Sequence, residues 1–168
     1  MNTRGDKKTW LFKVDATGNF SLKEIPLPKQ PNAEQFTYDF CPAPGGGYAM
    51  AGSVYTPGKF GNSLLYKTDK DGNLLWQKEL NIYMDDQIMS IVPTIDGYLL
   101  LAEAGFDDDW SNDVAGDIVL LKTDWQGNTQ WKRHWGAPGK TMRLKCWYPM
   151  PIVYWLADVY PGPGLLSP

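Results

Sequence analysis

The segment with the most evident potential for binding chemistry is residues 106–113, which read FDDDWSND. Carboxylate oxygens are the ligands that Ca²⁺ takes in proteins, and an exposed indole ring can stack on a sugar or a peptide. The candidate ligand-binding residues are Asp107, Asp108, Asp109, Trp110 and Asp113, and the candidate Ca²⁺ ligands among them are Asp107, Asp109 and Asp113. The alternative is a solvated acidic loop that keeps a sheet edge soluble.

A second acidic segment, DKDGN from Asp69, is similar in composition to a calcium loop. If Gly72 takes the sixth position of a twelve-residue loop, the first and last ligand positions fall on Lys67 and Lys78. Two cations at ligand positions exclude a calcium site of that type. We interpret the segment as a hairpin turn in which Asp69 accepts hydrogen bonds from backbone amides.

Residue types that carry covalent catalysis are sparse. His134 is the only histidine, so it has no second histidine with which to share a metal or a proton, and no G-x-S-x-G segment is present. Cys41 and Cys146 lack the paired spacing of a zinc site; one disulfide bridge is possible, and two free thiols are favoured. The sequence therefore identifies no catalytic residue and no cofactor.

An internal repeat organises the chain. The segments LFKVDATGNFSLKEI, LYKTDKDGNLLWQKEL and LLKTDWQGNTQWKRHW align without gaps, at intervals of 54 and 55 residues. D-x-x-G-N is typical of a hairpin turn, because the aspartate caps the turn and the glycine adopts a left-handed conformation. The repeated positions are Asp15, Gly18, Asp69, Gly72, Trp76, Asp124, Gly127 and Trp131.

A second pair of segments repeats between these turns. FCPAPGGGYAMAGS from Phe40 aligns with IVPTIDGYLLLAEA from Ile91. YAMAGSV and YLLLAEA are nearly continuous in small or apolar residues, which indicates a strand covered on both faces. A helix is the alternative for YLLLAEA, but Pro93, Gly97 and Gly105 limit it to about two turns.

The repeat predicts an all-β chain with four short antiparallel strands in each complete unit. The expected strands are Trp10–Val14, Asn19–Ile25, Phe36–Cys41, Tyr48–Val54, Ser63–Thr68, Asn73–Leu80, Gln87–Val92, Tyr98–Ala104, Asp117–Thr123 and Asn128–Trp135. Four-stranded sheets that recur every 50–55 residues and are buried on both sides are typical of the blades of a β-propeller.

The motif L-x-K-x-D-x-x-G-x-x-x-W resembles the repeat of pyrroloquinoline-quinone-type β-propellers. The chain resembles still more the bacterial and archaeal surface propellers, whose repeats read D-G-G-Y-x-x-A-G followed by K-T-D-x-x-G-N-x-x-W. The resemblance covers residues 10–136 and implies a partial β-propeller from an extracytoplasmic protein, in which the tryptophan docks between adjacent blades. The first unit departs from the pattern, because Leu22 stands where the alignment places Trp76 and Trp131.

The repeat also predicts the domain organisation. Residues 1–136 hold a half blade (1–25) and two blades (36–80 and 86–135). Residues 137–168 form an unassigned Pro-rich tail, either an unrelated extension or a next blade altered by a change of reading frame; the run PIVYWLADVY is compatible with one strand there. Because propellers close with typically four to eight blades, we expect a fragment of a larger protein that associates with further blades or with itself.

Composition narrows the function. A formal charge of −3 provides no basic field for nucleic acid, and no apolar run is long enough to span a membrane. The first ten residues contain no apolar core of a secretory signal, so an extracytoplasmic location rests on the resemblance alone.

We expect a non-catalytic binding or structural module with a glycan or protein ligand. The alternative is a fragment of a propeller enzyme, a quinone-dependent dehydrogenase or a hydrolase, and a third possibility is a pseudogene product with no selected function.

Overall fold

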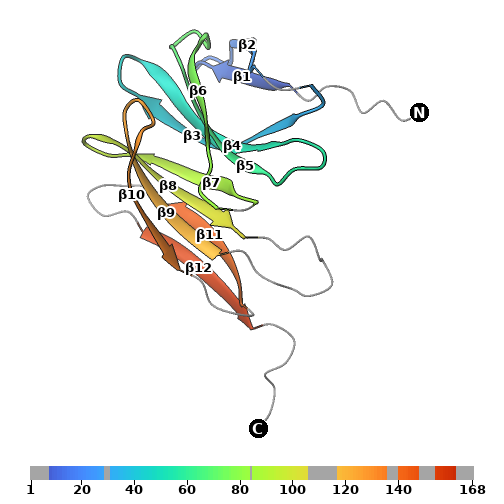
Figure 1. Cartoon of the computed structure of the whole chain (residues 1–168). Helices are drawn as coiled ribbons and strands as arrows, with labels where there is room; N and C mark the ends of the chain where they lie inside the picture. Colours follow the sequence, from blue (N-terminus) through green and yellow to red (C-terminus); the bar gives the residue numbers. More distant parts are fainter. Residues whose placement is uncertain are drawn as a thin grey trace.

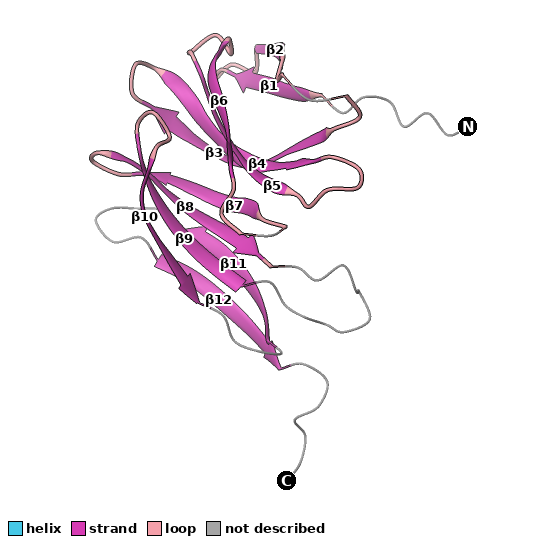
Figure 2. Ribbon diagram, viewed as in Figure 1, coloured by secondary structure: helices cyan, strands magenta, loops and turns pink. Residues whose placement is uncertain are grey.

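The computed structural model describes residues 8–28, 31–83, 85–105, 117–135, 140–147 and 154–161. Throughout these residues the regular structure is β-strand and no helix occurs, which confirms the all-β prediction and excludes a helix at YLLLAEA. Every strand pair is antiparallel (Figure 2).

The twelve strands of the described residues form four sheets, each with its strands in chain order. The first sheet is a hairpin of β1 (Thr9–Val14) and β2 (Phe20–Ile25). The second consists of β3 (Glu34–Ala43), β4 (Gly47–Tyr55), β5 (Asn62–Thr68) and β6 (Leu74–Leu80), and the third of β7 (Gln87–Pro93), β8 (Gly97–Ala104), β9 (Asp117–Asp124) and β10 (Thr129–Trp135). The fourth is a pair of β11 (Lys140–Trp147) and β12 (Tyr154–Pro161).

The sheets follow one another through the molecule in chain order, from the β1–β2 hairpin to the β11–β12 pair (Figure 1). One apolar cluster lies between the second and third sheets and includes Ala51, Leu65, Leu100 and Leu121. A smaller cluster lies between the hairpin and the second sheet, where Leu11 packs among residues of β4 and β5. Each of the first three sheets is therefore a layer that buries side chains against a neighbouring sheet.

Strands β4 and β8 lack the alternation of a half-exposed strand. All residues of β4 except Tyr48 and Tyr55 are buried, and Tyr98, Leu100 and Ala102 of β8 are fully buried. Small side chains predominate on β4, whereas leucines predominate on β8. These strands are covered on both faces, as their apolar runs predict.

Two strands occur within the Pro-rich tail, where the sequence indicates one. β12 falls on the run PIVYWLADVY, and β11 precedes it without a recognisable repeat motif. β11 lies near β7, which in turn lies near β3. Among the described residues, no helix is long and apolar enough to cross a membrane.

Candidate functional site

The acidic segment proposed as a ligand-binding loop lies outside the described residues, and with it Asp107, Asp108, Asp109, Trp110 and Asp113. The structure does describe the ends of this connection. Ala104 at the end of β8 pairs with Asp117 at the start of β9, so residues 105–116 leave and rejoin one edge of the third sheet. The equivalent connection between β4 and β5 is shorter, residues 56–61.

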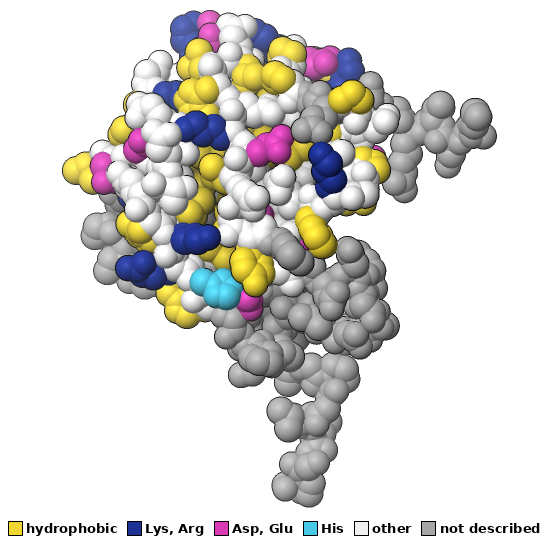
Figure 3. Space-filling model, in the orientation of Figure 1, with side chains coloured by type: hydrophobic (Ala, Val, Ile, Leu, Met, Phe, Trp, Pro, Cys, Tyr) yellow, Lys and Arg dark blue, Asp and Glu magenta, His cyan; other side chains and the backbone are white. Residues whose placement is uncertain are grey.

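Three polar or aromatic side chains lie beside this edge. Nε2 of His134 on β10 is 2.7 Å from Oδ2 of Asp117 on β9, and the imidazole stacks on the Tyr83 ring at a centroid distance of 6.0 Å. Tyr83 is 56% exposed, and the histidine lies on the surface (Figure 3). Sequence reasoning treated His134 as isolated, because its carboxylate partner on β9 lies 17 positions away in the chain.

The D-x-x-G-N turns use their carboxylates within the turn. Oδ1 of Asp69 accepts hydrogen bonds from the backbone amides of Asp71 (2.9 Å) and Asn73 (2.8 Å), and Oδ2 accepts one from Nδ2 of Asn73 (2.7 Å). Asp15 and Asp124 make the equivalent three bonds in their own turns.

These hydrogen bonds stabilise the charged carboxylates and lower their pKa values. The Asn19 and Thr17 side chains lower the pKa of Asp15 to about 2. The pKa of Asp69 is lowered chiefly by the Asn73 side chain, and that of Asp124 chiefly by the backbone amide of Asn128. The turn carboxylates are thus occupied by neighbouring donors.

The turn glycines touch the preceding sheet. Gly72 and Gly127 have positive φ angles of 79° and 75°. A Cβ atom at Gly72 would lie 3.0 Å from Cδ2 of Leu11 on β1, and one at Gly127 would lie 3.1 Å from the Trp76 ring on β6. The turn therefore closes the hairpin and also forms part of the contact between layers.

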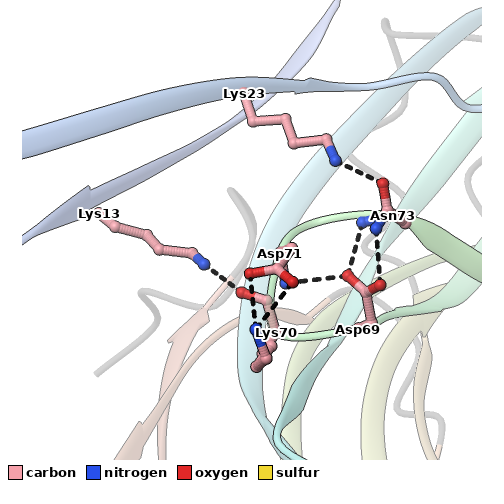
Figure 4. A network of polar contacts seen from close by, with 6 residues as sticks. All are labelled: Lys13, Lys23, Asp69, Lys70, Asp71 and Asn73. Carbon is pink, nitrogen blue, oxygen red and sulfur yellow. Dashed lines mark hydrogen bonds and ion pairs between the residues drawn. The ribbon is translucent and has the colours of Figure 1, made fainter.

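A lysine of the preceding sheet fastens each of these turns. Nζ of Lys23 on β2 donates to Oδ1 of Asn73, and Nζ of Lys78 on β6 donates to Oδ1 of Asn128, both at 2.5 Å. Figure 4 shows the first of these contacts, with Lys13 of the hairpin donating to the carbonyl of Lys70 beside it.

The segments that connect consecutive sheets are held by a third repeated contact. Nε2 of Gln77 on β6 donates to the carbonyl of Pro28 (2.9 Å), and Nζ of Lys132 on β10 donates to the carbonyl of Ile82 (3.0 Å). Gln77 and Lys132 each follow the repeated tryptophan. Equivalent residues therefore bind equivalent linkers.

A β-bulge sets the position of the repeated tryptophans. The register of β6 against β5 shifts so that Trp76 opposes Lys67, and Trp131 opposes Lys122 in the same way. The β1–β2 hairpin has no bulge, so Ser21 opposes Lys13 and Leu22 opposes Phe12. The gapless sequence alignment, which matches Leu22 to Trp76, therefore does not give the structural equivalence.

Asp86 is a buried charge that sequence reasoning missed. It is 1% exposed, and its carboxylate accepts hydrogen bonds from the backbone amides of Ser63 (2.7 Å), Ile82 (3.1 Å) and Tyr83 (3.1 Å). Burial raises its pKa, against the lowering effect of these donors. Asp86 ties the linker between the second and third sheets to the start of β5; a carboxylate directly before a strand was the available signal.

Asp39 joins the first strands of the two complete sheets. Its Oδ2 accepts one hydrogen bond from Oγ of Ser90 (2.8 Å) and one from the backbone amide of Ile91 (3.0 Å). Asp39 and Ser90 each follow the irregular position of their strand. Nearby, burial and then the charge of Asp39 raise the pKa of the Cys41 thiol to about 12, so this cysteine is a protonated core residue.

Within the described part of the chain, no group of three or more His, Cys, Asp or Glu side chains is arranged to hold a metal ion. The chain matches no protein-family model and no curated protein.

Proposed function

We propose that the chain forms part of a β-propeller in which each four-stranded sheet is a blade. Support comes from three contacts that are repeated between layers. The turn glycine packs on the preceding sheet, a lysine of that sheet donates to the turn asparagine, and a side chain of the outer strand donates to a carbonyl of the linker. Equivalent contacts between successive sheets favour the same rotation at each step, and repeated rotation of four-stranded sheets around an axis generates a propeller.

On this scaffold we propose a non-catalytic binding role, with an extracytoplasmic location as part of the proposal. The observation that carries it is the extended connection at residues 105–116, whose paired ends Ala104 and Asp117 lie beside the exposed Tyr83 and His134. Loops anchored on a rigid scaffold are frequent binding sites. The pairing of Ala104 with Asp117 fixes both ends of this connection to the sheet.

The proposed chemistry is recognition of a glycan or an extended peptide by aromatic stacking and acidic side chains. Trp110 supplies a flat apolar surface, and Asp108 supplies hydrogen-bond acceptors. Asp107, Asp109 and Asp113 supply oxygen ligands for a Ca²⁺ ion. No covalent step is involved.

A glycan and peptide microarray probed with the whole chain tests the binding role. We expect saturable binding that Trp110→Ala abolishes and that Phe60→Ala preserves. Phe60 is the matched control because it is an exposed aromatic residue in the equivalent β4–β5 connection. Equal binding by both variants, or no ligand for the parent chain, would overturn the binding role.

Calorimetric titration with CaCl₂ tests the metal separately. We expect heat for the parent chain and none for the triple variant Asp107→Asn, Asp109→Asn, Asp113→Asn. A parent chain that gives neither heat nor a thermal shift with millimolar Ca²⁺ would remove the ion from the proposal and leave the stacking contact to be judged on the array.

A further inference from the structure

Among the described residues, the repeated contacts between layers occur twice, and the residues that could make a third set lie at opposite ends of the structure. The first set joins the hairpin to the second sheet through Lys23 and Asn73. The second joins the second sheet to the third through Lys78 and Asn128. The equivalent donor on the third sheet is Arg133, which opposes Leu120 as Lys78 opposes Leu65 and Lys23 opposes Leu11.

Arg133 and Trp131 face away from the second sheet, and among the described residues no D-x-x-G-N turn packs against them. Trp131 is 39% exposed, whereas its equivalent Trp76 packs into the core cluster beneath Gly127. The Arg133 guanidinium lies over the Trp131 ring at 5.7 Å and donates to the carbonyl of Lys132. The third sheet thus carries a tryptophan and a cationic side chain that are equivalent to the ones contacted by a D-x-x-G-N turn on the second sheet.

The complementary turn is at the other end. Gly18 has a φ of 87°, and an added Cβ would meet nothing within 4 Å. Among the described residues, no lysine or arginine donates to Oδ1 of Asn19, although Nδ2 of Asn19 binds Asp15 as in the other turns. The turn from Asp15 to Asn19 is preformed for a contact that its equivalents make.

The hairpin also has an apolar face that its equivalents bury. The exposed side chains on this face are Trp10, Phe12, Val14, Phe20 and Leu22. The strand order makes β5 the counterpart of β1, and the β5 side chains at the same positions as Trp10 and Phe12 are Leu64 and Tyr66, both 0% exposed. Leu64 and Tyr66 are covered by the hairpin of the preceding layer, through Leu11 and Ile25.

The edges of the two-stranded sheets complement each other as well. In the four-stranded sheets, the third strand pairs with the second, as β5 does with β4 and β9 with β8. In the described structure β1 pairs only with β2, and β12 only with β11. By strand order β12 corresponds to β4 and β8, so β12 and β1 are the two strands that would join a β11–β12 pair and a β1–β2 hairpin into one four-stranded sheet.

We propose that two copies of this chain assemble head to tail, with the hairpin of each copy against the third sheet of the other. β12 of one copy pairs with β1 of its partner, the Gly18 turn covers Trp131, and Arg133 donates to Oδ1 of Asn19. The exposed hairpin face then packs against the third sheet of the partner copy. This contact is equivalent to the one by which the hairpin covers Leu64 and Tyr66 of the second sheet. Joined in this way, the described strands of the two copies form six four-stranded sheets, within the range in which propellers close.

This proposal rests on the propeller architecture proposed above and not on the binding loop. A monomer that still binds a ligand through Trp110 would therefore refute the assembly and leave the binding role intact. A stable dimer that binds nothing on the array would support the assembly and overturn the binding role.

Sedimentation equilibrium of the whole chain, over micromolar concentrations, tests the assembly. We expect a single species of twice the 18.9 kDa chain mass. Phe12→Asp places a charge in the apolar face and should yield monomer, whereas Ile95→Asp should remain dimeric, because Ile95 is 98% exposed and lies in the β7–β8 turn, outside the residues named for the two surfaces. A monomeric parent chain, or an open series of larger species, would overturn the proposal.

A charge exchange identifies the interface even if Phe12→Asp impairs folding. Arg133→Glu alone should weaken dimerisation on the order of tenfold, because it removes a charged donor and leaves an acceptor facing Asn19. Adding Asn19→Lys should restore the affinity. Circular dichroism verifies that each variant keeps its strands. A dimer whose affinity is unchanged in Arg133→Glu, or that Asn19→Lys does not rescue, uses a different interface and contradicts the proposal.

Discussion

Gly127 lies directly against the indole of Trp76, so that a Cβ atom on the glycine would stand 3.1 Å from Cη2 of the ring. The two residues belong to neighbouring sheets, and Gly127 also has the positive φ of 75° that closes its hairpin turn. One glycine thus satisfies a local requirement of the turn and a packing requirement between layers.

Gly127→Ala should be more destabilising than a glycine replacement that changes the turn alone. The left-handed conformation costs an alanine about 1 kcal/mol, and crowding against the indole adds about 1–3 kcal/mol. Urea unfolding followed by tryptophan fluorescence measures the loss. Gly58→Ala is the control, because Gly58 has a φ of 78° and nothing within 4 Å of an added Cβ. Equal losses for the two variants would show that the indole yields without cost.

Asp86→Ala should be among the most destabilising polar substitutions. It leaves the buried amides of Ser63 and Ile82 and the partly buried amide of Tyr83 without their acceptor, at about 1–3 kcal/mol for each buried unpaired group. Thermal unfolding should show a loss of at least about 3 kcal/mol. Asp71→Ala is the matched control: among the described residues its side chain binds the exposed Lys70 alone, so a change within about 0.5 kcal/mol is expected. Similar losses for both variants would contradict the role of Asp86.

The sequence predicts the layers of this fold better than the contacts between them. Ten strands follow from turn motifs and apolar runs, because both signals are local. The bulge that shifts Trp76 by one residue relative to the hairpin leaves no such signal, since Leu75 is an ordinary strand residue. Asp86 was missed for a related reason: its donors in β5 and the linker become neighbours only after the second sheet forms.

The acidic segment illustrates the opposite limit. Its residue types predict a binding chemistry directly, as Asp109 and Trp110 do. Where that chemistry is placed on the fold, however, depends on the strands to which the two ends of the segment are attached. The pairing of Ala104 with Asp117 supplies that information, and only the strand register contains it. The partnership of His134 with Asp117 at the same edge likewise follows from register.

Stability should decrease in acid through the turn aspartates. Asp15, Asp69 and Asp124 have folded-state pKa values below the ordinary 3.8, about 2 for Asp15. A lowered pKa stabilises the fold above pH 3.8, and this stabilisation is lost as the pH falls through the folded value. Asp86 has a raised pKa and acts in the opposite direction, but the three lowered groups outnumber it.

Melting temperatures between pH 6 and pH 2 test this dependence. We expect a decline that begins near pH 4 and becomes shallower in the double variant Asp69→Asn, Asp124→Asn, because asparagine caps the same turns without titrating. Asp86→Asn removes the opposing group and should steepen the decline. An unchanged slope in the double variant would show that other carboxylates govern acid unfolding.

Asp39 should contribute to stability by holding β3 and β7 together. Asp39→Ala removes the acceptor of two hydrogen bonds, one from the Ile91 amide and one from the Ser90 hydroxyl. Ile91 is 3% exposed. Leaving the amide unpaired costs about 1–3 kcal/mol, whereas Ser90→Ala deletes one hydroxyl bond and should cost about 1 kcal/mol. The combined variant should lose less than the sum of the two, since each substitution removes the same Asp39–Ser90 bond. Additive losses in urea unfolding would mean that the carboxylate and the hydroxyl stabilise their strands independently.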